Sequence, residues 1–342
     1  MVAASDFTTD LEAKVAQQLK SQRVGYLLGA GSSYLNRTGY PLAFELWDLI
    51  KDSISDEAKR NDIQAKLDGG ANGLEDALDL LDDGGATDTP YRHLVTDALA
   101  EMFMALTPPL DLHGEFVRRL AKHANPSVKV FSLNYDPLIE RAAARVRVRV
   151  LDGYLGAEHS YFDPAVFSER IGRIQGTFKA RKFDETVKPV HLLKLHGSLG
   201  WYDCPSNGIR RCEFGVKPPT GTKRLMVPPQ RRKAADTTAH PYSALWSVFR
   251  GCLAHNDPPL NRLVCIGYGF ADEHVNDVIE NALARTDFTV LIFTKELRAT
   301  AWSRWSAKAN VIVVTETQCS VKGATGPGHA DLWSFERLAK EV

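Results

Sequence analysis

The chain has 342 residues, of which 44% are apolar and 25% are charged, as in an ordinary soluble globular protein. Lysine and arginine together number 42, and so do aspartate and glutamate, so the net charge is zero. This balance argues against a protein built to coat nucleic acid or an anionic membrane, and we expect no direct sequence-specific binding of nucleic acid.

The cysteines and the N-terminal segment indicate where the protein works. Residues 1–20 are polar and acidic and lack the apolar core of a signal peptide. No window approaches the roughly 20 apolar residues that a membrane helix needs. The five cysteines are an odd, scattered set that does not resemble a disulfide framework. We therefore expect a reduced, cytoplasmic protein that does not enter a membrane.

The first third of the chain is predicted to be mainly helical. Apolar spacing predicts an opening helix over residues 10–20. The apolar run at residues 24–28 predicts a buried strand, which ends in Gly29-Ala30-Gly31-Ser32-Ser33. From residue 43 to about 125 the spacing is helical almost throughout, and we interpret this stretch as an insertion between the first two strands. Its predicted helices cover residues 43–54, 74–81, 91–106 and 112–123.

The rest of the chain alternates between apolar strands and helices. Residues 152–188, rich in glycine, aspartate and aromatic residues, are expected to form an irregular loop region. The expected strands cover residues 128–133, 146–151, 190–195, 225–227, 261–266, 288–293 and 311–314, and the expected helices cover residues 138–144, 243–255 and 273–285.

This alternation predicts the fold class. Continuous apolar strands are typical of parallel sheets that are covered on both faces, and strands alternating with helices predict a doubly wound sheet. We expect an α/β fold, a Rossmann-like doubly wound parallel sheet with a helical insertion, and a single domain over residues 1–342. A separate helical domain is the competing interpretation of the insertion, but no polar linker isolates it.

Polar or glycine-rich residues follow four of the predicted strands. In open parallel sheets, ligands bind outside the carboxyl ends of the strands. Glycines such as Gly29 and Gly31 permit a tight turn whose N–H groups are expected to hold a phosphate. The common fingerprint Gly-x-Gly-x-x-Gly is incomplete here, because its third glycine is missing. The four ends are Gly29-Ala30-Gly31-Ser32, Asn134-Tyr135-Asp136, His196-Gly197-Ser198, and Gly267-Tyr268-Gly269 with Asp272.

The order of these motifs resembles the sirtuin family. GAGSS, LNYD, KLHGS and a Gly-x-Gly followed by aspartate occur in the family's order over roughly residues 24–335. The large insertion is similar to the bacterial antiphage-defence branch of NAD-consuming enzymes. The resemblance implies that Asn134, Asp136 and His196 are catalytic. It assigns the binding of NAD to Gly29, Ala30, Gly31, Ser32, Gly197, Ser198, Gly267, Tyr268 and Asp272, the last three near the adenosine ribose.

Each of these residues also has a simpler interpretation. Asn134 and Asp136 would serve equally as caps of the helix that follows them. His196 would be a turn histidine, and Gly267 would permit close packing. Capping is as good an interpretation as catalysis for Asp136, and we likewise leave Asp272 and Tyr268 open.

The chain departs from protein-deacylating sirtuins in its cysteines. Those enzymes carry paired Cys-x-x-Cys sequences for zinc, whereas this chain has no Cys-x-x-Cys at all. Only Cys204 and Cys212 lie in the corresponding region. We expect no bound metal, and we expect a substrate other than acyl-lysine.

The resemblance therefore implies an NAD+ hydrolase that releases nicotinamide and ADP-ribose, with NAD as substrate. His196 would remove a proton, Asn134 would hold water or the ribose, and Asp136 would stabilise positive charge on the sugar. The rival interpretations are an NAD-dependent deacylase or ADP-ribosyltransferase, and a non-catalytic module that senses NAD or ADP-ribose. Unregulated hydrolysis would kill the cell, so we expect a homo-oligomer gated by a separate protein. The family suggests a HerA-type ATPase, an Argonaute-like protein or a phage component.

Overall fold

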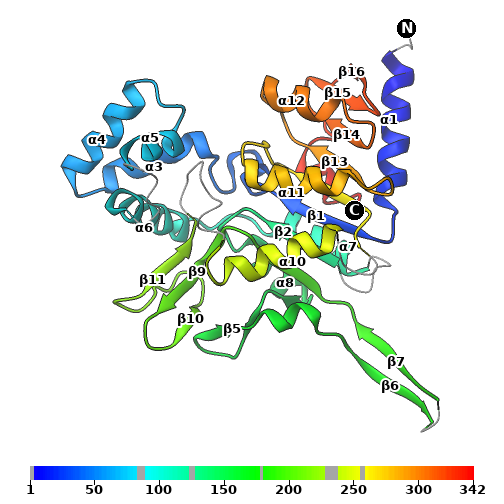
Figure 1. Cartoon of the computed structure of the whole chain (residues 1–342), viewed down its shortest axis with the longest axis horizontal. Helices are drawn as coiled ribbons and strands as arrows, with labels where there is room; N and C mark the ends of the chain where they lie inside the picture. The colour runs from blue at the N-terminus through cyan, green and yellow to red at the C-terminus, as the bar shows by residue number, and fades with distance from the viewer. Residues whose placement is uncertain (1–3, 83–88, 123–127, 178–179, 228–237, 255–258) are drawn as a thin grey trace.

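The computed structural model describes residues 4–82, 89–122, 128–177, 180–227, 238–254 and 259–342. Its centre is a nine-stranded sheet in the order β16-β15-β14-β13-β12-β1-β2-β8-β3 (Figure 1). The strands are β1 (Val24–Leu28), β2 (Val128–Ser132), β3 (Val150–Leu151), β8 (Val190–Lys194), β12 (Arg262–Ile266), β13 (Thr289–Phe293), β14 (Val311–Val314), β15 (Gln318–Val321) and β16 (Ala324–Pro327).

The central strands are parallel, as predicted. From β1 the chain moves outward to β2 and β8, and then returns to β12 on the other side of β1 before it continues to β13 and β14. The strand order therefore reverses between β1 and β12, which is where doubly wound sheets bind ligands. Only the edge strands β15 and β16 add to the sheet in antiparallel fashion. The predicted Rossmann-like α/β fold is confirmed.

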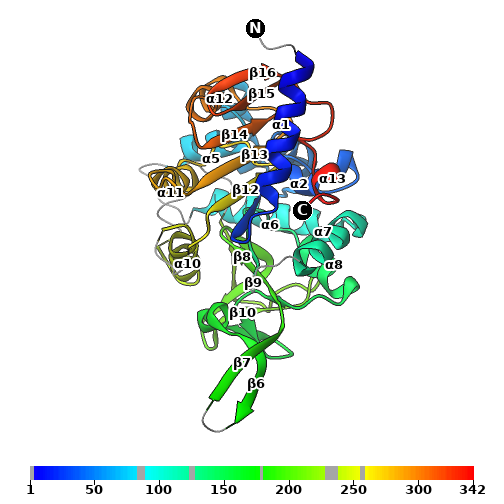
Figure 2. The ribbon, with the colours of Figure 1, turned by 90° about the vertical axis from the view of Figure 1, so that its right-hand side faces the viewer.

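Helices cover both faces of this sheet because successive strand residues point to opposite sides. Tyr26 and Leu28 pack with one set of helices, whereas Leu27 packs with the other. Figure 2 shows the two layers on either side of the strands. One layer contains α1 (Ala4–Leu19), α7 (Asp111–Lys122), α8 (Leu138–Val146) and α13 (Phe335–Leu338), and the other contains α10 (Tyr242–Ala254), α11 (Glu273–Leu283) and α12 (Ala299–Ser306).

The helical insertion has a core of its own and forms a lobe beside the sheet (Figure 1, blue to cyan). Its largest helix, α6, stacks Phe103 against Tyr40 at 4.9 Å between ring centroids. The sequence missed α4, because Ile63 is its only buried residue and no apolar period results. The elements are η2 (Ala43–Glu45), α3 (Leu46–Ile50), η3 (Lys51–Ser53), α4 (Glu57–Asp68), α5 (Leu74–Leu81) and α6 (Pro90–Ala105).

The insertion was predicted to end at about residue 125, but helix α7 near that end belongs to the Rossmann-like core. Residues 123–125 lie outside the described ranges. Phe116, Val117 and Leu120 of α7 pack on the sheet with Tyr26 and Val130. The ring of Phe116 meets that of Tyr26 edge-on at 5.5 Å. Two neighbouring parallel strands require a crossover element over the sheet face, and α7 serves as this element between β1 and β2. The insertion proper therefore ends with α6.

A second, antiparallel sheet joins the insertion to the Rossmann-like core, and the sequence did not predict it. Its order is β11-β9-β10-β5-β4. Leu199 of β9 and Met226 of β11 pack into the apolar core of the insertion. The strands are β4 (Tyr154–Leu155), β5 (Ser160–Phe162), β9 (Gly197–Cys204), β10 (Gly208–Arg211) and β11 (Lys223–Met226).

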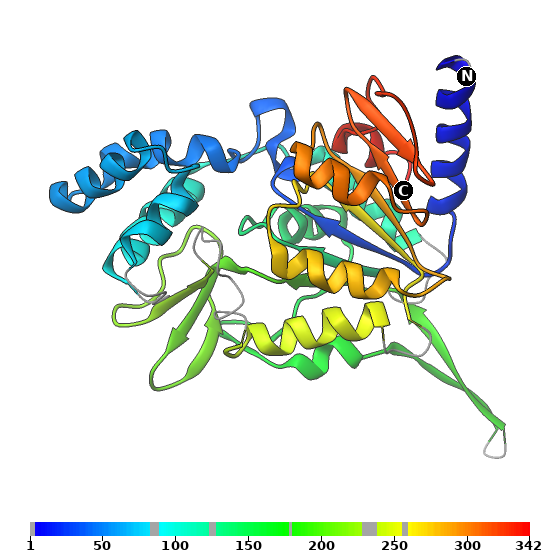
Figure 3. The same cartoon turned by 45° about the horizontal axis from the view of Figure 1, so that its top comes forward.

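The region expected to be irregular, about 152–188, is instead largely structured. It contains β4, β5, η4 (Pro164–Ser168) and a hairpin of β6 (Ile171–Thr177) and β7 (Ala180–Val187). The hairpin projects from the body in all three views (Figure 3). Within the described residues, β6 and β7 pair only with each other and neither face of the hairpin needs to be buried. Their sequence therefore lacks the alternation of apolar and polar residues that would have predicted the strands.

None of the helices in the described ranges combines the length and the apolar character that spanning a bilayer requires.

Candidate functional site

The carboxyl ends of four strands meet at one edge of the large sheet. Leu28, the last residue of β1, pairs with Ser132 of β2 on one side and with Ile266 of β12 on the other. Ser132 in turn pairs with Lys194, the last residue of β8. The four ends therefore stop in register, and the turns that follow them form one rim, as the sequence predicted.

Hydrogen bonds and contacts link these four turns in a closed ring. The Gly31 N–H donates to the Gly267 carbonyl at 2.9 Å, which joins the β1 turn to the β12 turn. Asn134 of the β2 turn reaches the β1 turn, and Ser198 beyond β8 reaches the β2 turn. His196 of the β8 turn lies 3.2 Å from Asp272 beyond β12, measured from Nε2 to Oδ2. The structure thus brings all of the predicted site motifs together.

The glycine turn is shaped by the neighbouring turn, and this corrects the expectation of free N–H groups. The N–H groups of Gly29, Gly31 and Ser32 donate to the carbonyls of Ile266, Gly267 and Gly29. A Cβ on Gly29 would lie 2.7 Å from the Gly267 oxygen, and one on Gly31 would lie 2.8 Å from the Gly267 Cα. The missing Cβ atoms therefore permit backbone packing. Ala30 stays exposed, and the binding of pyrophosphate at this turn stays a prediction.

Asn134 is the residue that ties the β2 turn to the β1 turn. Its Nδ2 atom donates to the Gly29 carbonyl at 3.0 Å, to Ser32 Oγ at 3.2 Å and to Ser33 Oγ at 2.9 Å. The side chain remains half-buried, whereas Ser32 and Ser33 are buried. Ser33 was part of the motif but was not singled out from the sequence, because nothing in the spacing shows which hydroxyl meets Asn134.

Asp136 is buried and caps the start of α8. Its Oδ1 atom accepts from the N–H of Leu138, the first residue of α8, at 3.0 Å, which fits the capping interpretation, although Pro137 occupies the N-cap position. Burial raises the pKa of the carboxyl group, and the nearby Lys194 ammonium and Ser33 hydroxyl oppose that shift. The Oδ2 atom is buried with no hydrogen-bond partner among the described residues. A buried carboxylate oxygen without a donor is a position where a ligand hydroxyl or a positive charge would fit.

Lys194 holds the β2 turn in place, and the sequence analysis overlooked it. The side chain is 1% exposed, and its Nζ atom donates to the Tyr135 carbonyl at 3.1 Å, to the Asp136 carbonyl at 2.5 Å and to Glu140 Oε1 at 3.1 Å. The Tyr135 carbonyl also accepts from Ser198 Oγ at 3.1 Å. Ser198, predicted to bind the cofactor, is thus placed between the two turns. A lysine inside an apolar strand was the signal that could have identified this contact, because a buried ammonium needs partners.

Tyr268 and Asp272 form the part of the ring beyond β12. The Tyr268 hydroxyl donates to the Asp272 carbonyl at 3.0 Å and to Asn276 Oδ1 at 3.1 Å, so it is directed into α11. Asp272 Oδ1 accepts from the N–H groups of His274 and Val275, which makes it the N-cap of α11. The sequence analysis predicted that Asp272 lies near the adenosine ribose. It did not predict the contact of Asp272 with His196, because the two residues are far apart in the sequence.

Cys204 and Cys212, in and next to the small sheet, are the residues that bear on whether the protein binds zinc. Among the described residues, no group of three or more histidine, cysteine or acidic side chains is placed to hold a metal ion. Cys204 Sγ lies 3.3 Å from Ser206 Oγ, and the Cys212 thiol donates to the carbonyls of Gly200 and Val216. We predict that elemental analysis of protein purified without a metal-affinity step will find far less than one zinc per chain. Stoichiometric zinc on Cys204 and Cys212 would contradict this and favour a deacylase.

The chain is similar to known proteins at the level of one family model and of distant solved structures. No match was found among curated proteins. Two solved structures cover 84% of this chain and 86% of their own: "Structural Basis for the Mechanism and Regulation of Sir2 Enzymes", at 13% identity and TM-score 0.40, and "Structure of Sir2Tm bound to a propionylated peptide", at 12% and 0.39. These similarities are too distant to inform the site. A family model described as SIR2-like domain matches residues 128–313, from β2 to β14, which is more than half of the chain. The protein therefore belongs to the SIR2-like domain family.

Proposed function

We propose that the protein is an NAD+ hydrolase that cleaves the bond between nicotinamide and ribose. The observation that carries this proposal is the placement of Asn134 and His196 after neighbouring parallel strands, on the rim where the strand order reverses. Ligands of doubly wound sheets bind at such a rim. Membership of the SIR2-like domain family supports NAD+ as the substrate.

The reaction consumes one water molecule and needs no metal or oxidant. The C1′–N bond breaks and its electron pair stays on the nicotinamide nitrogen, while a water oxygen bonds to C1′. The water proton passes to a base and then to solvent, so the products are nicotinamide, ADP-ribose and a proton. His196 is the base in this proposal, because imidazole exchanges protons near neutral pH.

The other two residues would position the reactants and stabilise charge. Asn134 is half-buried on the rim, so its side chain would orient the ribose or the attacking water. The Asp136 carboxylate would stabilise positive charge on the ribose through its buried Oδ2 atom. Burial raises the pKa of this carboxyl group, whereas a positively charged substrate beside it would lower that pKa and favour the ionised form.

A cavity beside the four strand-end turns supports one rival function, the transfer of ADP-ribose to an acceptor other than water. This cavity of about 870 Å³ lies between α6 and β11, and Val227 and Tyr242 are among its lining residues. The Val227 N–H donates to the His196 carbonyl at 2.9 Å, so the cavity borders the β8 turn. Its lining carries charges of both signs, including Asp97, Glu101, Lys217 and Arg224, and does not select one acceptor.

Mass spectrometry of the products tests the proposal. Purified protein, alone and with candidate activators, is expected to release nicotinamide from NAD+ together with an equal amount of free ADP-ribose. ADP-ribose attached to a protein, or an acylated ADP-ribose, would support transfer or deacylation instead. Tight binding of NAD+ without any turnover would support a sensing module.

We further propose that the hydrolase acts in antiphage defence as a homo-oligomer held inactive by a separately encoded protein. The insertion is the largest part of the chain that the Rossmann-like core does not need, and it presents exposed apolar side chains at Phe44, Leu49 and Leu80. A HerA-type ATPase, an Argonaute-like protein or a phage component would fit the family resemblance. Light scattering and co-purification from the native host test this. A monomer fully active without a partner would overturn it.

A further inference from the structure

His196 and Asp272 form a buried pair that the sequence did not connect. The Nε2 atom of His196 lies 3.2 Å from Oδ2 of Asp272, and the two side chains are 3% and 5% exposed. His196 comes from the turn after β8, whereas Asp272 begins α11 after β12, so the pair bridges the two halves of the doubly wound sheet. In the proposed function His196 is the base, and the inference below rests on that function.

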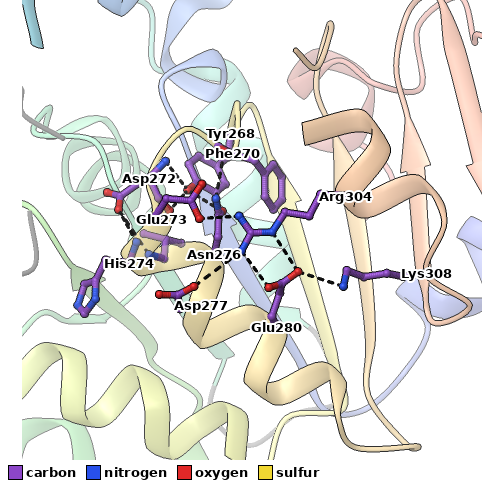
Figure 4. Close-up of polar contacts among 11 residues, drawn as sticks. Tyr268, Phe270, Asp272, Glu273, His274, Asn276, Asp277, Glu280, Arg304 and Lys308 are labelled. Carbon is purple, nitrogen blue, oxygen red and sulfur yellow. Dashed lines mark hydrogen bonds and ion pairs between the residues drawn. The ribbon is translucent and has the colours of Figure 1, made fainter. Parts of the chain in front are cut away.

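Two backbone donors and a helix N-terminus stabilise the carboxylate of Asp272 against the cost of its burial. Its Oδ1 atom accepts from the His274 N–H at 3.2 Å and from the Val275 N–H at 3.4 Å. Backbone donors and the N-terminal end of a helix both stabilise a carboxylate. Figure 4 shows Asp272 at the start of α11, close to Tyr268, whose hydroxyl accepts from the Asp272 N–H at 3.3 Å. The other carboxylate oxygen, Oδ2, lies at ion-pair distance from the histidine, 3.2 Å from its Nε2 atom.

Trp246 lies beside the His196 ring and holds the backbone next to it. Its ring centroid lies 6.5 Å from that of His196, and its indole N–H donates to the carbonyl of Leu195, the residue before the histidine. The indole is fully buried. A histidine with a carboxylate at one nitrogen and a fixed indole beside the ring has little freedom to rotate.

The chemistry of the pair determines which ring nitrogen carries the proton. An ionised carboxylate accepts hydrogen bonds and cannot donate them. A carboxylate 3.2 Å from Nε2 therefore favours hydrogen on that nitrogen in the neutral imidazole, and the lone pair then lies on Nδ1. We propose that Asp272 is a positioning residue that fixes His196 in the Nε2–H form, so that Nδ1 is the atom that accepts the proton during hydrolysis.

The ionisable groups near the pair include Tyr268, whose hydroxyl contacts the backbone of Asp272, and His274 with Arg250. His274 of α11 stacks on Trp246 at 4.1 Å between ring centroids, and burial lowers its pKa, with a further decrease from nearby Arg250. Lys194, two residues before His196, directs its ammonium group away to the β2 turn. Titration of His274, influenced by Arg250, would also contribute to a pH profile of the reaction. Kinetics of variants and NMR of the ring nitrogens separate His196 from these groups.

The variant Asp272→Asn tests the pairing while it preserves the helix cap. Asparagine caps helices about as well as aspartate, so α11 should keep its N-terminus. The asparagine amide would present an N–H to Nε2, which forces the proton onto Nδ1 and removes the accepting lone pair. We expect kcat for NAD+ hydrolysis to fall by about 10²–10⁴-fold, the contribution of general acid–base catalysis, with little change in KM.

Two comparisons make the kinetic result specific. Glu273→Gln removes a carboxylate from the next residue of α11, but Glu273 is exposed and its Oε2 lies 2.5 Å from Arg304 (Figure 4), so activity should stay near that of the wild type. In a His196→Ala background, Asp272→Asn should cause almost no additional loss, because a positioning residue acts only through the residue that it holds. Full additivity of the two losses would overturn the proposal.

Nitrogen NMR provides a readout that does not require activity. The chain has 10 histidines, so the protein labelled with ¹⁵N-histidine gives a resolvable set of ring signals, and a His196→Gln variant assigns the relevant one. Wild-type His196 should show a protonated Nε2 and an unprotonated Nδ1, and Asp272→Asn should reverse them. A protonated Nδ1 in neutral wild-type His196 would overturn the proposal. If the wild type hydrolyses no NAD+, the proposed function fails, and the NMR result still decides the pairing.

Discussion

Replacing His196 with alanine is expected to lower the rate of NAD+ hydrolysis by about 10²–10⁴-fold, because the reaction loses its general base. The residue is buried near both Asp272 and Trp246, so the variant should be checked for folding by its thermal midpoint. His329→Ala is a suitable control, because His329 contacts Glu12 of α1 rather than the ring of turns. A His196→Ala protein with near-wild-type turnover would show that the catalytic site has been assigned wrongly.

Asn134→Ala is expected to reduce turnover by a similar factor, and its effect on folding can be separated from its effect on catalysis. The change removes the donor that serves the Gly29 carbonyl and the hydroxyls of Ser32 and Ser33. The Gly29 carbonyl keeps the Ser32 N–H and hydroxyl as donors, so the loss falls mainly on the two serine hydroxyls. Each hydrogen bond contributes about 0.5–1.5 kcal/mol net, so a moderate fall in stability is expected as well. Denaturant unfolding measures that part, and turnover measured well below the unfolding transition measures the rest. Unchanged turnover would remove Asn134 from the site.

A large loss in the free energy of unfolding is expected from Gly267→Ala. Gly267 has φ of +65°, and a Cβ there would lie 2.3 Å from the Ser32 nitrogen and 2.6 Å from the Gly31 carbonyl carbon. The backbone conformation alone costs a non-glycine residue about 1–3 kcal/mol, and the collision with rigid backbone adds to that. Because the β1 and β12 turns must separate to relieve it, the variant should also lose any NAD+ binding at the rim.

Gly269→Ala provides the matched control two residues away. A Cβ on Gly269 would meet nothing within 4 Å. The same chemical change should therefore leave the free energy of unfolding within about 0.5 kcal/mol of the wild type, as is usual for unconstrained surface positions. Equal destabilisation by the two substitutions in denaturant titrations would mean that the packing of the two turns does not depend on Gly267.

The parts of the fold that the sequence predicted well are those whose burial is complete. Strands β1 and β14 are buried at every position and appear as uninterrupted apolar runs, and β8 is equally buried although His191 and Lys194 interrupt its apolar run. Helices with a continuous apolar stripe, such as α5, were also predicted with correct bounds. Elements that bury little had no such signal. Helix α4 buries only Ile63, and the β6–β7 hairpin has exposed Ile174 and Phe183.

The candidate site shows the same division between local pattern and tertiary contact. The sequence by itself placed Asn134, His196 and Gly267 after strands that share one edge, because the ends of parallel strands meet at that edge. Only the tertiary structure decided what their atoms contact. The glycines adjoin another backbone turn, Asp136 caps α8, Lys194 holds the β2 turn, and Asp272 faces His196. These contacts join residues from different strands, and their partners are set by strand order and register, which no local spacing encodes.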